Sequence, residues 1–340
     1  MKTFLLILSF TMTLASCSTP DTRTGSPHFS DGRFHNLGPK DQKEVSFVTF
    51  AKYRLFNSPP DWPESVENVV GKTDLSPVAG SGVKITLIRH ATVLLQYNDL
   101  NVITDPMFSK RASPVSFAGP KMIREPAVSL ENLPKIDLVL VSHSHYDHLD
   151  LPSLKKLQEK YQPTFLVGLG LKSFLEAEGL HNVVELDWFE AHSFKDATIH
   201  FLPAQHFSAR TPWGQNQTLW GSFFIEAGNK KVYFAGDTAM GPHFEMTKEK
   251  LGAPDVSLLP IGAYEPRWFM KTHHINPVEA VQAHQILASK QSLAMHYQSI
   301  PLAYDRLEQP AEDLKNAIEG ANLRAGEFDT PDFGESHFYK

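Results

Sequence analysis

Short runs of apolar, β-branched and aromatic residues, separated by polar turns, dominate the chain from Val83 onward. Their length and composition predict buried strands. The expected strands lie within 83–90, 92–97, 98–106, 136–143, 164–170, 197–206, 222–237, 255–263 and 292–297. The stretch 222–237 is expected to form a hairpin that turns at Gly228 and Asn229. Apolar residues at helical spacing predict helices over 149–161, 171–179 and 276–289, the last with Pro277 near its first turn. Strands that alternate with helices in this way indicate a layered α/β architecture.

Residues that commonly bind metals follow one of these strands directly. The stretch LVLVSHSHYDHLD (138–150) contains His143, His145, Asp147 and His148 within six positions. Alternate residues of an extended segment face the same way, so His143 and His145 can reach one ion. Asp147 and His148 can reach a second ion nearby. Imidazole nitrogen and carboxylate oxygen are suitable ligands for zinc, and also for manganese or iron.

The four ligand-type side chains within residues 143–148 cannot complete two coordination spheres, so further ligands are expected from other strand ends. Candidates are His206 in PAQH, Asp237 in FAGDT and His296 in AMHY. Each of these residues alone would more often be structural than a ligand. They become candidates because loops after strand ends are where layered α/β proteins build their sites. Asp237 is the expected bridging carboxylate, since two ions about 3.5–4 Å apart can share one ligand.

The same residues resemble a known family. HSHYDH (143–148) matches the HxHxDH motif of the metallo-β-lactamase superfamily, and the three later segments follow in that superfamily's order. DPMFSKRASP (105–114) and PIGAYEPRWFMK (260–271) are similar to the branch of N-acyl-phosphatidylethanolamine-hydrolysing phospholipases D. The resemblance spans about residues 83 to 305. It implies an α/β fold of the αββα sandwich type, with two β-sheets flanked by helices.

The resemblance also implies a binuclear centre that holds two zinc ions. One expected group of ligands consists of His143, His145 and His206. The other consists of Asp147, His148 and His296, and Asp237 bridges the two groups. Asp147, Asp237 and His274 are expected at the reaction centre.

Two further histidines match positions that the family places near the metals. His274 lies in HHINP, where its neighbour His273 is an equally good match, so either could be the site histidine. His90, in IRHAT, is expected to orient a metal ligand from outside the coordination sphere.

The implied reaction is hydrolysis of a membrane phospholipid by a metal-bridging hydroxide. N-acyl-phosphatidylethanolamine or a related lipid would yield phosphatidic acid and an N-acylethanolamine. Arg267 and Lys121 are candidate phosphate contacts. Two alternatives stay open: a lactonase or small or cyclic phosphodiester hydrolase on the same metal cage, and a lipoprotein that binds metal or lipid without turnover.

The N-terminus indicates where the protein acts. Met1 and Lys2 precede an apolar run that is shorter than the ~20 residues a membrane-spanning helix needs, which is typical of a signal peptide. LASC ends this run and resembles a bacterial lipobox with Cys17, the only cysteine, as the lipidated residue. Ser18 favours sorting to the outer membrane. We therefore expect a lipid-anchored protein on the periplasmic face of a bacterial membrane.

The expected organisation has three parts. Residues 1–17 form the signal peptide, and residues 18–35, rich in Ser, Thr, Pro and Gly, form a flexible tether. Residues 36–340 form one hydrolase domain with its core over about 83–305, in which 44–56 can form a short amphipathic helix. The net charge of −6 and the lack of a basic block exclude a surface built for nucleic acid. The oligomeric state is not determined by the sequence.

Overall fold

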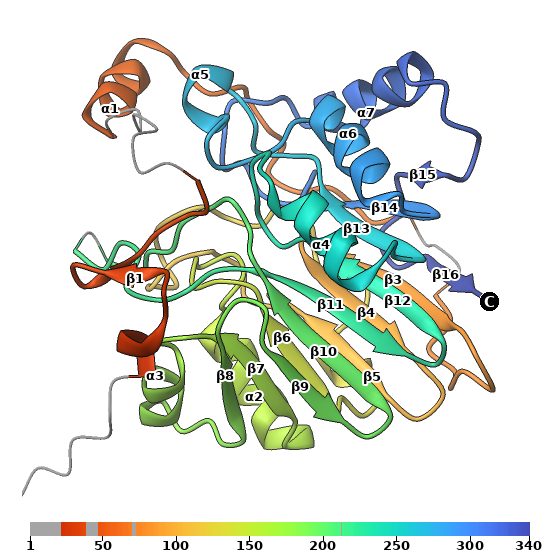
Figure 1. Cartoon of the computed structure of the whole chain (residues 1–340). Coiled ribbons are helices and arrows are strands. Elements are labelled where there is room, and N and C mark those ends of the chain that lie inside the picture. Colours follow the sequence, from red (N-terminus) through yellow and green to blue (C-terminus); the bar gives the residue numbers. More distant parts are fainter. Residues whose placement is uncertain (1–21, 39–46, 70–72, 212) are drawn as a thin grey trace, which may run out of the picture.

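The computed structural model describes residues 22–38, 47–69, 73–211 and 213–340. Two seven-stranded sheets form the centre of the molecule, and helices cover their outer sides (Figure 1). This arrangement confirms the expected α/β sandwich of two sheets flanked by helices. The predicted signal peptide, Cys17 and residues 18–21 lie outside the described residues.

The two sheets share one pattern of strand order. In spatial order, the first sheet contains β16 (Ser336–Tyr339), β3 (Val83–Arg89), β4 (Thr92–Gln96), β5 (Asn101–Thr104), β6 (Leu138–Val141), β7 (Thr164–Gly168) and β8 (Val183–Leu186). The second contains β15 (Phe328–Asp329), β14 (Gln291–Met295), β13 (Val256–Pro260), β12 (Lys230–Phe234), β11 (Ser222–Ala227), β10 (Ala197–Leu202) and β9 (Ala191–Phe194). Followed along the chain, β3–β8 and β9–β15 each begin with antiparallel hairpins and continue with parallel strands.

This strand order decides where the loops meet. β3, β5 and β6 run in one direction, because two antiparallel pairings and one parallel pairing connect them. By the same reasoning β10, β12, β13 and β14 run in one direction. The loops that follow these strands therefore gather at one edge of each sheet. The β11–β12 hairpin turns at Gly228 and Asn229 as predicted, with positive φ at both residues.

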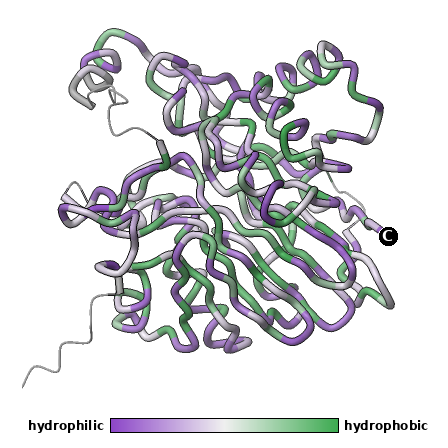
Figure 2. Tube along the Cα trace, viewed as in Figure 1, coloured by the Kyte–Doolittle hydropathy of each residue, from purple (hydrophilic) through white to green (hydrophobic). Residues whose placement is uncertain are grey.

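Helices follow the parallel strands, as crossover connections require. They are α2 (Leu151–Tyr161), α3 (Lys172–Ala177), α4 (His243–Leu251), α6 (Pro277–Leu287) and α7 (Gln309–Gly320). Leu154 and Leu157 of α2 are fully buried against the first sheet, as their spacing predicts. α6 begins with a capping box between Asn276 and Glu279. Hydrophobic residues lie within the strands, whereas the turns between strands are more hydrophilic (Figure 2).

The predicted tether is wrong for residues 22–35, which are folded. They form a short 3-10 helix, η1 (Thr22–Gly25), and the strand pair β1 (Phe29–Ser30) and β2 (Arg33–Phe34). Phe34 is fully buried in the main core, and its backbone N–H donates to the Asn216 carbonyl. The polar composition of this segment concealed its one buried apolar side chain, Phe34, which fastens the segment to the body.

The chain beyond residue 305 also belongs to the folded core. β15 extends the second sheet beside β14, while β16 returns to the first sheet and pairs with β3. The C-terminal segment therefore supplies an edge strand to each sheet. Near the other end of the chain, α1 (Phe47–Phe56) coincides with the helix expected over 44–56, and Tyr53 packs against Trp268 of α5 (Arg267–Met270).

Candidate metal centre

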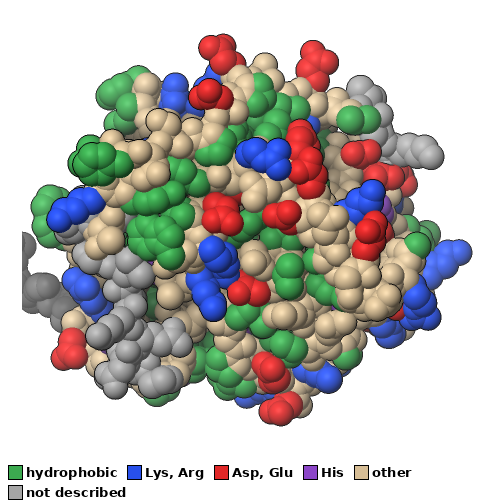
Figure 3. Space-filling model, turned by 90° about the horizontal axis from the view of Figure 1, so that it is seen from above, with side chains coloured by type: hydrophobic (Ala, Val, Ile, Leu, Met, Phe, Trp, Pro, Cys, Tyr) green, Lys and Arg blue, Asp and Glu red, His purple; other side chains and the backbone are tan. Residues whose placement is uncertain are grey.

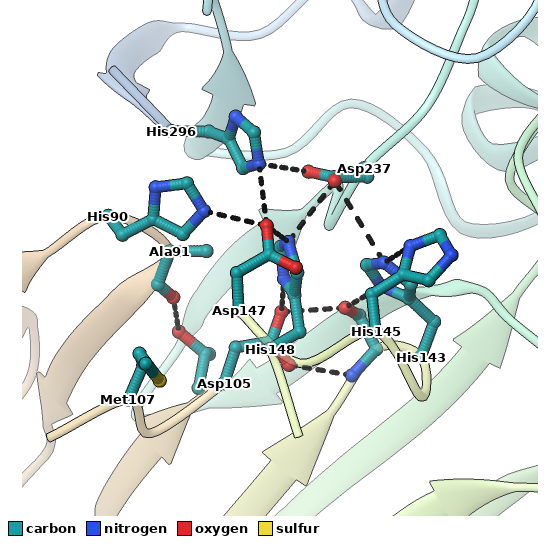
Figure 4. A network of polar contacts seen from close by, with 12 residues as sticks. His90, Ala91, Asp105, Met107, His143, His145, Asp147, His148, Asp237 and His296 are labelled. Carbon is teal, nitrogen blue, oxygen red and sulfur yellow. Dashed lines mark hydrogen bonds and ion pairs between the residues drawn. The ribbon is translucent and has the colours of Figure 1, made fainter. Parts of the chain in front are cut away.

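The seven expected ligands meet at the edge where the two sheets end together. Figure 4 labels all of them except His206. They are His143, His145, Asp147 and His148 after β6, His206 after β10, Asp237 after β12 and His296 after β14. The first sheet contributes the compact motif, and the second contributes three isolated residues. The structure thus brings together every residue that the sequence predicted as a ligand.

The first group consists of three imidazoles whose nitrogens converge. His145 Nδ1 lies 2.8 Å from His143 Nε2 and 3.3 Å from His206 Nε2. The opposite nitrogens of two rings already have acceptors: His143 Nδ1 contacts the Ser142 hydroxyl, and His206 Nδ1 donates to the His273 carbonyl. In that tautomer the Nε2 lone pairs of His143 and His206 face the centre, where a cation can bind them.

The second group combines imidazoles with carboxylates. Asp147 Oδ2 lies 3.3 Å from His148 Nε2 and 3.6 Å from His296 Nε2. The Asp237 carboxylate lies between the two groups. Its oxygens are 3.1 Å from His148 and from His296, and 3.8–3.9 Å from His206 and His143. This central location is the one expected of a bridging ligand.

Burial sets the charge of the first group. It lowers the pKa of His145 to about 4 and holds the pKa values of His143 and His206 well below their usual range. All three imidazoles are therefore neutral at pH 7, which is the form that binds a metal.

The carboxylates keep their charge despite burial. Burial alone would raise the pKa of Asp147 and of Asp237, but the histidines around them outweigh it and hold both pKa values well below the usual range. Burial opposes charge on His296 too, yet Asp237 and Asp147 raise its pKa to about 9. Two buried carboxylates thus require positive charge beside them, which protons or divalent ions can provide.

Several buried ligand atoms form no hydrogen bond, which is a further sign that the site can hold a divalent ion. His148 Nε2, His296 Nε2 and Asp237 Oδ1 are buried and lie at ion-pair distance from the opposite group, but none of them forms a hydrogen bond among the described residues. Buried polar atoms normally form hydrogen bonds, so three that form none at one point indicate a ligand. Nitrogen and carboxylate ligands in this arrangement suit zinc and related ions.

Asp105 supports the centre and was not predicted. It follows β5, and its Oδ2 lies 2.7 Å from His148 Nδ1 and 2.6 Å from the Ser142 hydroxyl, which in turn contacts His143. Burial raises the pKa of Asp105, while His148 and Ser142 stabilise its ionised form. A carboxylate on Nδ1 orients the ring of a metal-binding histidine. Its position directly after a strand was the signal that could have identified it.

Asn36 is a second supporting residue that the sequence did not reveal. Its side chain donates to the His206 carbonyl at 2.8 Å and accepts from the His206 N–H at 3.1 Å. Trp220 also donates to it through the indole N–H. The N-terminal hairpin, residues 22–38, therefore fixes the backbone of one candidate ligand. No local pattern connects residues 170 positions apart, so only the folded chain shows this contact.

His90 lies beside the second group, as expected. Its Nε2 is 3.2 Å from Asp147 Oδ2, and its carbonyl accepts from the His296 backbone N–H. His90, Asp105 and His296 all have positive φ, which costs energy in residues other than glycine. Such strain is typical of functional sites. At His296 the turn also requires Gly262, since a Cβ there would lie 2.2 Å from the His296 carbonyl oxygen.

The structure shows different roles for His273 and His274. His274 Nδ1 is buried and lies 4.0 Å from Asp237 Oδ2, in one cluster with His206 and Asp237. His273 instead supplies its backbone carbonyl to His206, and its ring packs against Phe207. His274 is therefore the histidine whose side chain faces the centre.

The two candidate phosphate contacts stay predictions. Arg267 forms an ion pair with Glu279 and donates to the His274 carbonyl at 2.8 Å. Its guanidinium thus holds the turn that carries His274. Lys121 is exposed, and its ammonium lies 3.5 Å from the Glu64 carbonyl.

Comparison with known proteins agrees with this geometry. A family model described as a beta-lactamase superfamily domain matches residues 100–297. Over 268 residues the chain is 40% identical to N-acyl-phosphatidylethanolamine-hydrolyzing phospholipase D 1 of Caenorhabditis elegans, and the match covers 75% of each chain. The chain belongs to the metallo-β-lactamase superfamily, in the branch of these phospholipases. Membership, together with the candidate His/Asp cluster, supports a metal-dependent hydrolase.

The fold is shared with solved metallo-hydrolases. The structure of Igni18, a metallo hydrolase of the archaeon Ignicoccus hospitalis, superposes with a TM-score of 0.59 at 22% identity. That match covers 76% of this chain and 99% of the other. A shorter match, 38% identical over 99 residues, joins 29% of this chain to 73% of the outer membrane protein RomA of Klebsiella pneumoniae. Within the described part of the chain, every helix is too short or too polar to cross a bilayer.

Proposed function

We propose that this protein is a phospholipase D-type phosphodiesterase that cleaves N-acyl-phosphatidylethanolamine or a related phospholipid. The observation that carries the proposal is the 40% identity to a phospholipase of this kind over 75% of both chains. The convergence of all seven expected ligands at one edge supports it. The same convergence argues against a protein that binds metal or lipid without turnover.

In the proposed reaction, a water oxygen adds to phosphorus and the bond from phosphorus to the N-acylethanolamine oxygen breaks. The N-acylethanolamine leaves with a proton, and phosphatidic acid remains. Two divalent ions, zinc by preference, would supply Lewis acidity and lower the pKa of water at the centre. Asp105 and the His273 carbonyl hold the ligand imidazoles in the required tautomer. His274, with its unpaired and buried Nδ1 beside Asp237, is the residue we assign to proton transfer at the leaving oxygen.

We further propose that lipidated Cys17 anchors the enzyme to the periplasmic face of a bacterial membrane, where its substrate is found. The partial match to an outer membrane protein supports the outer membrane as the location. Several acyl chains on one residue provide stable anchoring, because each buried methylene contributes about 0.8 kcal/mol.

The decisive test is a product analysis. The metal-loaded full chain would be incubated in heavy-oxygen water with vesicles that contain N-acyl-phosphatidylethanolamine, and the lipids would be analysed by mass spectrometry. We expect N-acylethanolamine and phosphatidic acid with one heavy oxygen on its phosphate. His145→Ala should abolish both products, whereas the matched control His181→Ala, at an exposed position, should retain them.

Other outcomes would redirect the assignment. Diacylglycerol as a product would keep the metallohydrolase and shift the cleaved bond. An unchanged lipid profile with metal still bound would refute the phospholipid substrate and favour lactones or small phosphodiesters.

A further inference from the structure

Four segments that surround the metal centre have an unusual charge pattern. Residues 47–56, 106–122, 207–217 and 267–274 contain Lys and Arg but no Asp or Glu, in a chain whose net charge is −6. Together with the N-terminal hairpin, residues 22–38, we call these four segments the site face. Arg210 and Arg267 are already bound within the protein, to backbone carbonyls and to Glu279. The other Lys and Arg side chains of these segments are exposed or half-buried, and they favour an anionic partner.

The site face is continuous through direct contacts. Tyr53 of α1 packs on Trp268 of α5, with ring centroids 5.3 Å apart. Phe269 of α5 packs on His273, and Phe207 joins His273 to the metal centre, since its ring lies 4.7 Å from that of His273 and 4.4 Å from that of His145. On the other side, Arg23, Ser113 and Thr211 line one pocket of about 540 Å³ together with Tyr146 of the metal loop.

Large apolar side chains are exposed on the same face. Trp213, Phe117 and Phe56 are each more than 80% exposed, and Leu55 and Trp268 also reach solvent. In the view from above, hydrophobic side chains gather in the region of α1 and α5, with Lys and Arg among them (Figure 3). Among the described residues, Val278 and Phe338 are exposed apolar residues on other segments. Aromatic and basic residues in combination are typical of a surface that enters the headgroup region of a bilayer.

The N-terminal hairpin adds a geometric constraint. Four residues, 18–21, separate Cys17 from η1, which is folded onto the body. At about 3.4 Å per residue this connection spans at most about 17 Å, whereas a free tether over 18–35 would have reached roughly 60 Å. A globular chain of this length has a radius of gyration of about 20 Å, so the radius of the body exceeds the reach of the connection. A lipid on Cys17 can therefore bring only the surface near Thr22 to the membrane.

We propose that the site face docks on the anionic phospholipid surface, and that the four-residue connection to lipidated Cys17 fixes this orientation. The inference rests on the proposed anchor and deepens the proposed function, because it identifies the membrane as the partner of the surface around the centre. Phe117 and Trp213 enter the bilayer, while the exposed Lys and Arg residues of the site face contact headgroups.

Fluorescence quenching tests the docking without any turnover. The lipidated full chain would be reconstituted into vesicles of phosphatidylethanolamine and phosphatidylglycerol, with and without brominated acyl chains. We expect strong quenching of tryptophan emission in the wild type. Trp213→Phe should lose a large part of the quenched signal, because Trp188 and Trp220 are buried and Trp268 is about half as exposed as Trp213. Quenching that is absent in the wild type, or unchanged in Trp213→Phe, would overturn the docking.

A second pair of variants distinguishes docking by this face from nonspecific hydrophobic binding to the membrane. The double change Phe117→Ser and Trp268→Ser should reduce the quenching of Trp213 severalfold. The matched control, Val278→Ser and Phe338→Ser, should leave it unchanged. Equal losses in both pairs would contradict a specific docking face.

A longer connection tests the role of the short one. Insertion of about 20 Gly and Ser residues between Thr19 and Pro20 should lower the quenching severalfold, since the effective concentration of a tethered surface falls with linker length. Unchanged quenching would overturn the connection as the orienting device. These results are independent of the proposed reaction: quenching without lipid hydrolysis would refute only the substrate, and hydrolysis without quenching would refute only the docking.

Discussion

The two sheets build their shares of the metal centre in different ways. The first sheet presents His143, His145, Asp147 and His148 on one loop after β6, whereas the second presents His206, Asp237 and His296 on three separate loops. The ligands from the first sheet are close together in the sequence and can be recognised as a motif. The second exists only because β10, β12 and β14 run in one direction and end at one edge.

The supporting residues differ between the sheets as well. In the first, Asp105 follows a neighbouring strand and orients His148 through a charged hydrogen bond. In the second, a neutral amide from the N-terminal hairpin, Asn36, fixes the backbone of His206. A hydrogen bond to a charged carboxylate is stronger than a hydrogen bond to a neutral amide. The comparison therefore predicts unequal costs when the supports are removed.

The largest effect is expected at the residue that joins the two shares. Asp237→Ala should remove metal from both groups and abolish activity, because its carboxylate lies within 4 Å of histidines from each. His145→Ala and His296→Ala should each lose less metal than Asp237→Ala. Metal-to-protein ratios by mass spectrometry measure the difference. Equal metal contents in the three variants would contradict a bridging role.

Asp105→Asn should have the next largest effect. Loss of the charged acceptor on His148 Nδ1 should lower metal affinity or activity by about 10–100-fold. Competition with a chelator of known affinity would measure it. Asp99→Asn, in the exposed β4–β5 turn, serves as the matched control and should behave as the wild type. A wild-type affinity in Asp105→Asn would refute the orienting role.

Asn36→Ala should cost less than Asp105→Asn. It removes neutral hydrogen bonds to the His206 backbone, and a net loss of about 1 kcal/mol corresponds to about fivefold in affinity or activity. The same chelator assay applies, with exposed Asn98→Ala as control. If Asn36→Ala proved as damaging as Asp105→Asn, the proposed contrast between the two supports would be wrong.

The smallest effect is expected far from the centre. Lys155 of α2 pairs with Glu178 beyond α3 at 2.7 Å, and both side chains are more than one third exposed. Lys155→Ala should change the free energy of unfolding by less than about 0.5 kcal/mol, since exposed pairs contribute little. Urea unfolding would measure this. A larger loss would mean that this exposed ion pair, rather than buried Leu154 and Leu157, fastens α2.

Strand positions and the compact motif could be read from the sequence because each depends on local pattern. The β11–β12 turn at Gly228 and Asn229, and the Pro277 start of α6, are examples that the structure confirms. Residues 22–35 were misread because polar composition outweighs a single buried Phe34 in any local average. Likewise, no local signal assigns β16 to the first sheet or β15 to the second.

For this protein, the sequence by itself determined the strands β3–β7 and β10–β14, which family the motifs resemble and which side chains are suitable ligands. These properties follow from side-chain chemistry and short-range periodicity. Only the tertiary structure decided that His274 rather than His273 faces the centre, that Asp105 and Asn36 support His148 and His206, and that the N-terminal segment is folded beside the site. Each of these depends on strand direction and on contacts between distant segments, which no local pattern encodes.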